Sequence, residues 1–196
     1  MNTSAASPSV LALSGGIGGA KLALGLTQAM PPEKLLIVGN TGDDFEHLGL
    51  HVSPDLDTLM YTLSGKADPE KGWGLASESW AFMQALEALG GETWFQLGDG
   101  DLATHVERTR RLRAGESLTE VTSDFCRCLG IVSRIVPVSD DAVRTIVETP
   151  DGDLAFQHYF VRERCQPTVS GFRFQGADAA QPNPLFWEAL RNPSLQ

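Results

Sequence analysis

Short, almost continuous runs of apolar residues mark the first part of the chain. The run at residues 9–14 leads into a glycine-rich loop at residues 15–19, and apolar residues then recur at helical spacing over residues 20–29 until two prolines interrupt them. A second apolar run follows at residues 35–38. The order strand, glycine loop, helix, strand predicts a βαβ unit whose two strands pair in parallel.

Helical spacing recurs further along the chain. Ser53 and Pro54 have the residue types of an N-cap and a first helical position, and Gly65 follows the end of the helix that they predict. A helix over residues 77–89 would carry one apolar stripe, made of Trp80, Met83, Leu86 and Leu89. That spacing is typical of a helix that faces the core. Further helices are expected at residues 103–114, from the Ser117 and Glu120 capping box to Gly130, and at residues 184–191.

The period changes towards the C-terminal side. Residues 144–149 and 154–161 are rich in β-forming residues, and the turn between them predicts a hairpin. Within the second run, alternation places on one face Leu154, Phe156, His158 and Phe160. Another short strand is expected at residues 94–97. The predicted fold class is therefore α/β, a Rossmann-like parallel sheet flanked by helices, with an antiparallel β-hairpin insertion at about residues 143–162 in a single domain of residues 1–196.

Charge and composition exclude several classes of function. The chain has 196 residues, with 15 Lys and Arg against 25 Asp and Glu and a formal net charge of −10, so it would repel nucleic acid and anionic membranes. No apolar run is long enough to span a membrane, and the first ten residues lack the pattern of a signal peptide. Three cysteines are too few for a disulfide framework. We expect a cytoplasmic protein that binds neither nucleic acid nor membrane.

The glycine-rich loop is the first candidate binding feature, and its glycines are Gly15, Gly16, Gly18 and Gly19. Exposed backbone N–H groups and a helix N-terminus at one point suit an anionic ligand. The loop is neither a dinucleotide nor a Walker A motif, because Lys21 stands where the former needs glycine and is followed by Leu22 where the latter needs Ser or Thr. We interpret it as a phosphate loop of another type. The alternative is a tight turn that only lets the helix pack on the sheet.

Acidic residues gather near the far ends of the predicted strands, in three pairs: Asp43 and Asp44 after the second strand, Asp55 and Asp57 at the start of the next helix, and Asp99 and Asp101 after a later strand. In open α/β sheets, ligands bind outside the carboxyl ends of the strands, so these loops would meet the glycine loop in one crevice. Carboxylates beside a phosphate require a cation between them, and Mg²⁺ uses one or two carboxylates together with phosphate oxygens. The pattern therefore favours metal-assisted phosphoryl chemistry. For Asp55 alone, stabilisation of the helix dipole is the favoured role.

Other residues admit a second interpretation. His47 and His51 have zinc-site spacing if they lie on a helix near Asp43, although Gly49 weakens that helix and a third ligand is unspecified. His105 and His158 are more typical of structural histidines. One basic cluster has the pattern of a solvated helix face, of which one turn could meet a diphosphate: Arg108, Arg110, Arg111 and Arg113.

Seven segments carry recognisable motifs in order along the chain: Ser-Gly-Gly-Ile-Gly-Gly-Ala-Lys at 14–21, Asn-Thr-Gly-Asp-Asp at 40–44, Ser-Pro-Asp-Leu-Asp-Thr at 53–58, Gly-Trp-Gly at 72–74, Leu-Gly-Asp-Gly-Asp-Leu-Ala-Thr-His at 97–105, Pro-Val-Ser-Asp-Asp at 137–141 and Phe-Gln at 156–157. Together they resemble the 2-phospho-L-lactate transferase family of coenzyme F-420 biosynthesis. The resemblance implies transfer of a phospholactate or phosphoenolpyruvate-derived moiety from a guanosine diphospho donor to the ribityl hydroxyl of the deazaflavin Fo. It also implies Mg²⁺ as cofactor and GMP as the leaving group.

The same resemblance implies roles for individual residues. Asp57 would bind the acceptor near the metal and orient or deprotonate its hydroxyl, and Asp43 and Asp44 would lie on the metal side. The donor phosphates would meet Gly15, Gly16, Gly18, Gly19 and Asn40. Gln96 stands where some members have a lysine that contacts the acceptor, and Asp99 is a further expected substrate-binding residue.

Family members continue past this length with a Pro-Ser-Asn-Pro loop and a Val-Ser-Pro segment. The chain therefore resembles the N-terminal two-thirds of a larger domain, with an incomplete donor site and an apolar surface that would favour a homodimer. The alternative function is that of a non-catalytic nucleotide-sugar-binding regulator related to gluconeogenesis factor, which shares a similar glycine loop and Asp-Asp segment. Residues 54–58 together with residues 98–101 favour the transferase.

Overall fold

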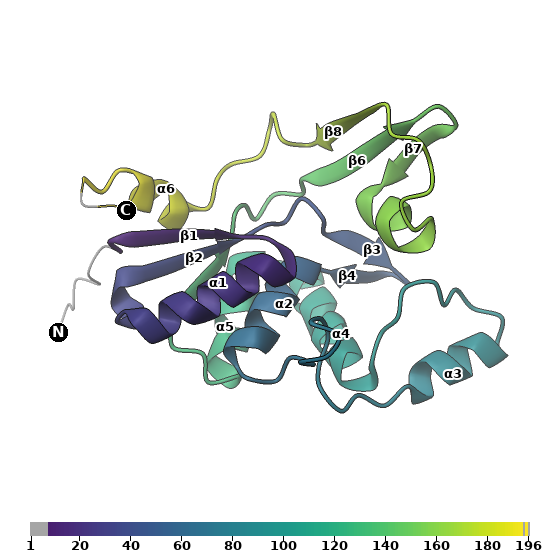
Figure 1. The fold of residues 1–196 in the computed structure, drawn as a ribbon, viewed down its shortest axis with the longest axis horizontal. Helices are drawn as coiled ribbons and strands as arrows, with labels where there is room; N and C mark the ends of the chain where they lie inside the picture. Colours follow the sequence, from purple (N-terminus) through teal and green to yellow (C-terminus); the bar gives the residue numbers. More distant parts are fainter. Residues whose placement is uncertain (1–7, 194, 196) are drawn as a thin grey trace.

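The computed structural model describes residues 8–193 and residue 195, and a parallel sheet lies at its centre (Figure 1). The strands β1 (Val10–Ser14), β2 (Leu35–Gly39) and β5 (Arg134–Pro137) pair in the order β1-β2-β5, and both pairings are parallel. All five residues of β2 are buried, as expected for a strand covered on both faces. The predicted βαβ unit and the α/β fold class are confirmed.

Alternate residues of β2 enter two separate apolar cores. Leu35 and Ile37 face α1 (Gly16–Ala29), α2 (Pro54–Leu63) and α5 (Leu118–Cys128), where small residues of α1 allow close packing. Leu36 and Val38 face the opposite side, which α6 (Pro184–Leu190) covers. A short 3-10 turn, Pro32–Lys34, leads into β2. Helices therefore flank both faces of the sheet.

Local signals located several helices correctly. Helix α2 begins at Pro54, and α5 follows a complete capping box in which Ser117 and Glu120 bond each other's backbone N–H groups. Helix α4 (Asp99–Arg113) begins four residues before the predicted start at residue 103. Among the described residues, no helix has both the length and the apolar character that a membrane span requires. Residues 1–7, part of the segment that lacked a signal-peptide pattern, lie outside the described ranges.

Two antiparallel sheets accompany the central one. Strands β3 (Phe45–His47) and β4 (Leu50–Val52) form a short hairpin, and β6 (Arg144–Thr149), β7 (Gly152–Ala155) and β8 (Gly171–Gln175) form a sheet in the order β7-β6-β8. The hairpin insertion is confirmed, but its predicted end at about residue 162 is wrong, because β8 adds a third strand.

The predicted strand at residues 154–161 ends early. Strand β7 stops at Ala155, and the chain continues in helical conformation through a π-helix, His158–Arg162. The rings of Phe156 and Phe160 stack at 5.6 Å between centroids and 9° between planes. Residues four apart are neighbours on a helix, so the apolar spacing that we interpreted as strand alternation also fits this turn.

The predicted strand at residues 94–97 is absent. Trp94 and Phe95 instead join an aromatic cluster with Phe45 and His47, in which ring centroids lie 4.9 to 6.1 Å apart. Their apolar character reflects side-chain packing and not strand pairing.

Helix α3 (Ala81–Ala88) is shorter and less buried than predicted. It begins at Ala81 because the Asp99 carboxylate accepts hydrogen bonds from the backbone N–H groups of Ala81 and Phe82. Of the predicted core stripe only Met83 is buried, and Leu89 is 86% exposed. The core interpretation of the stripe is wrong, because α3 lies at the periphery, away from the central sheet (Figure 1).

Candidate functional site

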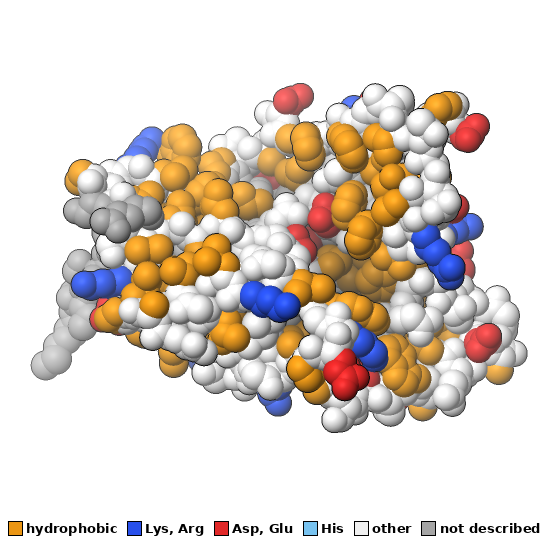
Figure 2. Space-filling view, viewed as in Figure 1, with side chains coloured by type: hydrophobic (Ala, Val, Ile, Leu, Met, Phe, Trp, Pro, Cys, Tyr) orange, Lys and Arg blue, Asp and Glu red, His pale blue; other side chains and the backbone are white. Residues whose placement is uncertain are grey.

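A cavity of about 630 Å³ opens at the carboxyl ends of β1 and β2. Its polar side is lined by Gly15 and Gly16 after β1, by Asn40 and Asp43 after β2, and by the first turns of α2. Figure 2 shows the hollow with acidic side chains inside it and hydrophobic side chains around it. The expected convergence of the glycine loop with acidic loops in one crevice is therefore present.

The glycine loop divides into two parts with different uses. Helix α1 already begins at Gly16, which has a φ of +60° that favours glycine, and Gly15 and Gly16 line the cavity. Gly18 and Gly19 lie in the first turn of α1 and do not line it. A Cβ on Gly19 would lie 2.4 Å from Ser14 Oγ, so this glycine lets the helix pack against β1. Gly19 therefore fits the interpretation as a tight turn for helix packing, whereas Gly15 and Gly16 lie where a phosphate loop would need them.

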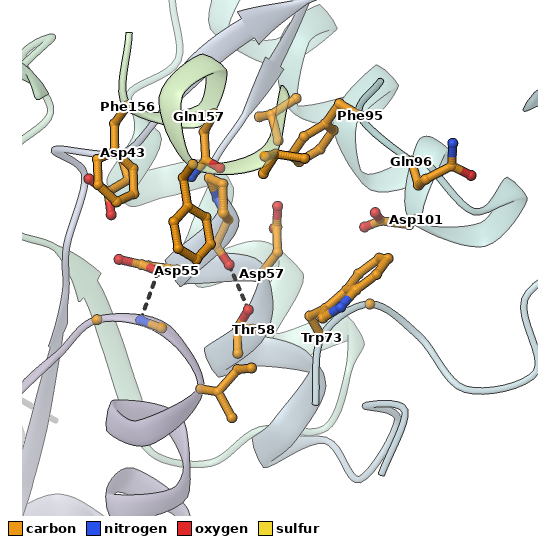
Figure 3. Close-up of a pocket in the computed structure, with 18 of the residues that line it drawn as sticks. Asp43, Asp55, Asp57, Thr58, Trp73, Phe95, Gln96, Asp101, Phe156 and Gln157 are labelled. Atoms are coloured by element: carbon orange, nitrogen blue, oxygen red, sulfur yellow. Dashed lines mark hydrogen bonds between the residues drawn. The ribbon is translucent and has the colours of Figure 1, made fainter. Parts of the chain in front are cut away.

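Asp55 connects the loops that form the polar side of the cavity. Its carboxylate accepts a hydrogen bond from the backbone N–H of Gly16, at 2.7 Å, drawn as a dashed line in Figure 3, and a second one from Asn40 Nδ2, at 2.9 Å. Asn40 Oδ1 in turn accepts from the N–H of Gly42, at 2.9 Å. Burial raises the pKa of Asp55, and the bonds from Asn40 and Gly16 oppose that rise. Asp55 does lie in the first turn of α2, as the helix-dipole role favoured from the sequence requires. That role does not include its hydrogen bonds with Gly16 and Asn40.

Asp57 forms a buried ion pair with Arg108 of α4. The guanidinium bonds both carboxylate oxygens: Nη1 lies 3.2 Å from Oδ2, and Nη2 contacts Oδ1. Arg108 is 1% exposed, so its assignment to a solvated face is wrong. The sequence pattern missed it because clustered arginines are typical of a solvated face, and Arg110 of the same cluster is indeed exposed and pairs with Glu107 on the helix surface.

A buried polar network continues behind this pair. His105 lies between the two carboxylates of Asp57 and Asp101, with Nδ1 3.7 Å from the first and Nε2 3.2 Å from the second. The Tyr61 hydroxyl donates to Asp101 at 2.6 Å. Ligand atoms of Asp57, Asp101 and His105 lie within 4.8 Å of one another and could hold a metal ion. The Arg108 cation beside this group opposes a second positive charge there.

The two aspartates of the Asp-Asp segment lie in different surroundings. Asp43 lines the cavity, and burial together with the charges of Asp55 and Asp44 raises its pKa to about 6. Asp44 is 2% exposed and does not line the cavity; its Oδ2 accepts from Ser53 Oγ at 2.8 Å and lies 3.1 Å from His51 Nε2. Of the metal-ligand set predicted from the sequence, Asp43 and Asp57 line the cavity and Asp44 lies behind its wall.

The zinc interpretation of His47 and His51 lacks its structural basis. The two residues lie on the paired strands β3 and β4 and not on a helix. His47 packs in the aromatic cluster, 5.0 Å from Trp94 between ring centroids, and burial lowers its pKa. His51 contacts Asp44 and Ser53.

Aromatic side chains form the other side of the cavity: Trp73, Trp94, Phe95, Phe156 and Phe160. Gln96 also lines it, with its Nε2 bonded to the Thr93 carbonyl at 2.8 Å. Asp99 does not line the cavity, since its carboxylate holds the start of α3. Our sequence interpretation assigned no role to these aromatic residues, although Trp73 and Phe156 belong to two of the seven motifs.

The cavity therefore has two chemically different parts. One presents a helix N-terminus, an amide and several carboxylates, which suits phosphate groups in the presence of a divalent cation. The other presents aromatic rings, which suit a flat ring system.

Comparisons with known proteins identify relatives of this chain. The sequence model of the family described as 2-phospho-L-lactate transferase CofD matches residues 10–195. A phosphoenolpyruvate transferase from Streptomyces coelicolor is 43% identical over 186 residues, covering 92% of this chain and 58% of that protein. A 2-phospho-L-lactate transferase from Methanosarcina mazei is 37% identical over 181 residues, covering 92% of this chain and 60% of that protein. The chain thus spans less than two-thirds of the length of these relatives.

A solved structure shares the fold. The crystal structure of a UPF0052 family member from Bacillus halodurans superposes with a TM-score of 0.58 and 16% identity, covering 93% of this chain and 55% of that one.

Proposed function

Because the chain belongs to the 2-phospho-L-lactate transferase (CofD) family, we propose that it takes part in coenzyme F-420 biosynthesis. The proposed reaction transfers a phospholactate or phosphoenolpyruvate-derived moiety from a guanosine diphospho donor to the ribityl hydroxyl of the deazaflavin Fo. The ribityl oxygen bonds to the phosphorus that carries the lactyl or enolpyruvyl group, the bond from that phosphorus to the bridging oxygen breaks, GMP leaves with that oxygen, and the hydroxyl proton passes to water. The observation that carries the proposal is one cavity with a phosphate-compatible side and an aromatic side.

The aromatic side is the proposed binding site of the deazaflavin ring. The stacked pair Phe156 and Phe160 and the indole of Trp73 offer flat apolar surface to a planar tricyclic acceptor. Gln96 has an amide oxygen that can accept a hydrogen bond from the acceptor. The ribityl chain would extend from these rings towards the carboxylates of α2.

Asp57 is the proposed catalytic residue, and its surroundings favour orientation of the acceptor hydroxyl. Arg108 bonds both carboxylate oxygens, which fixes their position, and its charge opposes the rise in the pKa of Asp57 that burial causes. An oxygen held in this way can still accept a hydrogen bond from the ribityl hydroxyl and align it for attack on phosphorus. The geometry therefore supports orientation more strongly than proton abstraction.

The donor phosphates are proposed to lie at the start of α1. Asn40 lies next to the backbone N–H groups of the glycine loop: a Cβ added to Gly15 would be 3.6 Å from the Asn40 Cβ. A helix N-terminus offers partial positive charge to phosphate oxygens. Gly18 and Gly19 would support this geometry from within the helix and not by direct contact.

Mg²⁺ fits the carboxylates on this side of the cavity. Asp43 and Asp57 offer hard oxygen ligands, and Asp44 lies behind them. The pKa of Asp43 is raised mainly by burial and further by the negative charges of neighbouring carboxylates. A bound Mg²⁺ would stabilise negative charge on the phosphoryl oxygens. We propose Asp43 and Asp57 as the residues that face this ion.

The transferase proposal is tested by incubating the protein with Fo, Mg²⁺ and the guanosine donor. GMP and a deazaflavin phosphodiester should appear together in equal amounts by mass spectrometry. Because the chain spans 58% of its Streptomyces relative, a form of full family length is assayed in parallel. Absence of product from both forms would contradict the transferase and favour the non-catalytic regulator. A cytoplasmic location and a homodimer, expected from the sequence, remain part of this proposal.

A further inference from the structure

The connection between α2 and α3 brings one aromatic ring to the cavity. Residues 66–76 lie in this connection, and Trp73 among them lines the cavity. Figure 3 shows Trp73 and Phe156 on opposite sides of the cavity. Trp73 is 42% exposed, so the surrounding protein covers only part of its indole. A planar acceptor in the cavity can therefore lie between rings from two different parts of the chain.

Hydrogen bonds fix the backbone of residues 66–76 as a closed turn. Ala67 and Leu75 pair as an antiparallel bridge at its base. The N–H of Asp68 donates to the carbonyl of Gly74, at 3.1 Å, and the N–H of Gly72 donates to the carbonyl of Asp68, at 2.9 Å. Gly72 and Gly74 flank the tryptophan and have φ values of +74° and +70°, which favour glycine. These contacts position the backbone that carries the indole but do not by themselves fix the ring.

Lys71 contacts the indole through its side chain. Its Nζ lies 5.5 Å from the ring centroid of Trp73 and 4.8 Å from that of Trp80, and a cation within about 6 Å of an indole is attracted to the ring. Trp80 is the N-cap of α3, and its carbonyl accepts from the N–H of Gln84 at 3.0 Å. Asp68 Oδ2 lies 3.8 Å from the same ammonium. Lys71 therefore links the ring of Trp73 to the fixed start of α3.

We propose that Lys71 is a positioning residue, which holds the indole of Trp73 against the ring of the acceptor in the cavity. This inference rests on the proposed function, which supplies a planar acceptor. Lys71 does not line the cavity, so its effect on the acceptor passes through Trp73 and not through direct contact. With the indole held in place before binding, the acceptor does not have to order that side chain itself.

Lys66 provides a matched control for this assignment. It belongs to the same segment, carries the same charge and is exposed, as Lys71 is. Within the described part of the chain, the Lys66 ammonium forms no ion pair and lies over no aromatic ring, unlike that of Lys71. Lys66→Met and Lys71→Met therefore remove the same charge from the same segment, but only the second removes a contact with Trp73.

The experiment measures Fo binding by the fluorescence of its deazaflavin ring, without donor and without turnover. Lys71→Met should weaken Fo binding about threefold, whereas Lys66→Met should leave it unchanged. Lys71→Arg should keep the affinity, because a guanidinium also binds aromatic faces. Trp73→Leu should weaken Fo binding roughly tenfold through the lost ring contact. Circular dichroism and urea titrations confirm that each variant is folded.

A double variant separates positioning from direct contact. Lys71→Met introduced together with Trp73→Leu should weaken Fo binding no further than Trp73→Leu alone, because the lysine acts through the indole. An ionic contact between Lys71 and Fo would instead give the same threefold loss with or without the indole, and this result would overturn the proposal.

Three further results would overturn the proposal: equal Fo affinity in Lys71→Met and the unaltered protein, equal losses in Lys66→Met and Lys71→Met, or a loss in Lys71→Arg as large as in Lys71→Met. Absence of Fo binding to the unaltered protein would overturn it as well. If Fo binds with the expected pattern but no phosphodiester forms in the transfer assay, the role of Lys71 stands and the proposed reaction fails. If product forms but the pattern is absent, the reaction stands and the role of Lys71 fails.

Discussion

The carboxylate of Asp57 on α2 and the guanidinium of Arg108 on α4 form a bidentate ion pair in which both side chains are almost fully buried. Arg108 Nη1 also lies 3.4 Å from the His51 carbonyl of β4 and 3.3 Å from His105 Nδ1. One arginine therefore connects α2, α4 and the β3-β4 hairpin at the floor of the cavity. The pair fixes a carboxylate that lines the cavity and also makes its position sensitive to changes in α4.

Removing one member of this pair should destabilise the fold. Arg108→Met leaves the Asp57 carboxylate buried without a counter-charge, which should lower the free energy of unfolding by about 3–5 kcal/mol in urea titrations. Arg108→Lys keeps the charge but cannot bond both carboxylate oxygens in the same way, so it should lower the free energy of unfolding by less.

Arg110→Met serves as the control, because Arg110 is exposed and pairs on the helix surface with Glu107 of its own helix. We expect little change in stability from it. Equal effects of the Arg108→Met and Arg110→Met substitutions would show that burial of the pair has no energetic consequence.

The two kinds of glycine in the loop should respond oppositely to alanine. Gly16→Ala places a side chain at φ +60° and should cost about 1–2 kcal/mol. Gly18→Ala lies within α1 with no atom within 4 Å of the added Cβ, and it should stabilise the helix by about 0.5–1 kcal/mol. Thermal unfolding of both variants measures the difference, and destabilisation by Gly18→Ala would contradict the assignment of these two roles.

Asp43 should make stability depend on pH. The pKa of Asp43 is about 6 in the folded protein, against an ordinary value of 3.8. Between pH 3.8 and pH 6 the folded protein therefore binds more protons than the unfolded chain. Stability should therefore be highest below the lower limit and fall as pH rises through 6, by on the order of 1–2 kcal/mol from this group.

Urea titrations at pH 4.5 and pH 7, with a chelator present, measure this difference in stability between the two pH values. Asp43→Asn should make the difference smaller. Added Mg²⁺ should stabilise the protein more at pH 7 than at pH 4.5, because the cation binds the ionised carboxylate. Stabilisation by Mg²⁺ that is equal in Asp43→Asn and in the unaltered protein would remove Asp43 from the metal side.

Features of the fold that depend on neighbouring residues could be predicted from the sequence. The βαβ unit, the start of α2 and the capping box of α5 follow from residue types within one turn or strand. The failures involve distant partners. The Trp94 segment resembles a strand but packs on β3, and α3 begins where Asp99, the first residue of the next helix α4, accepts hydrogen bonds from its first N–H groups.

In the candidate site, too, local motifs could be predicted from the sequence, whereas contacts between distant residues could not. The motifs located Asp43, Asn40 and Asp57 at one crevice because the carboxyl ends of parallel strands meet there. Arg108 was assigned to a solvated face because it belongs to a cluster of arginines, and the approach of α2 to α4 buries it. Burial and pairing depend on tertiary contacts that residue spacing does not contain.

The catalytic assignment of Asp57 requires a variant that separates chemistry from folding. Asp57→Asn should lower kcat at least about 100-fold by weakening the alignment of the acceptor hydroxyl, but it also leaves Arg108 buried without its counter-charge. The double variant Asp57→Asn, Arg108→Gln removes both charges and should recover much of the lost stability while kcat stays low. Single-turnover assays with Fo at saturation, together with urea titrations, measure the two quantities separately. If kcat recovers along with stability, Asp57 acts only through the fold and has no direct part in the reaction.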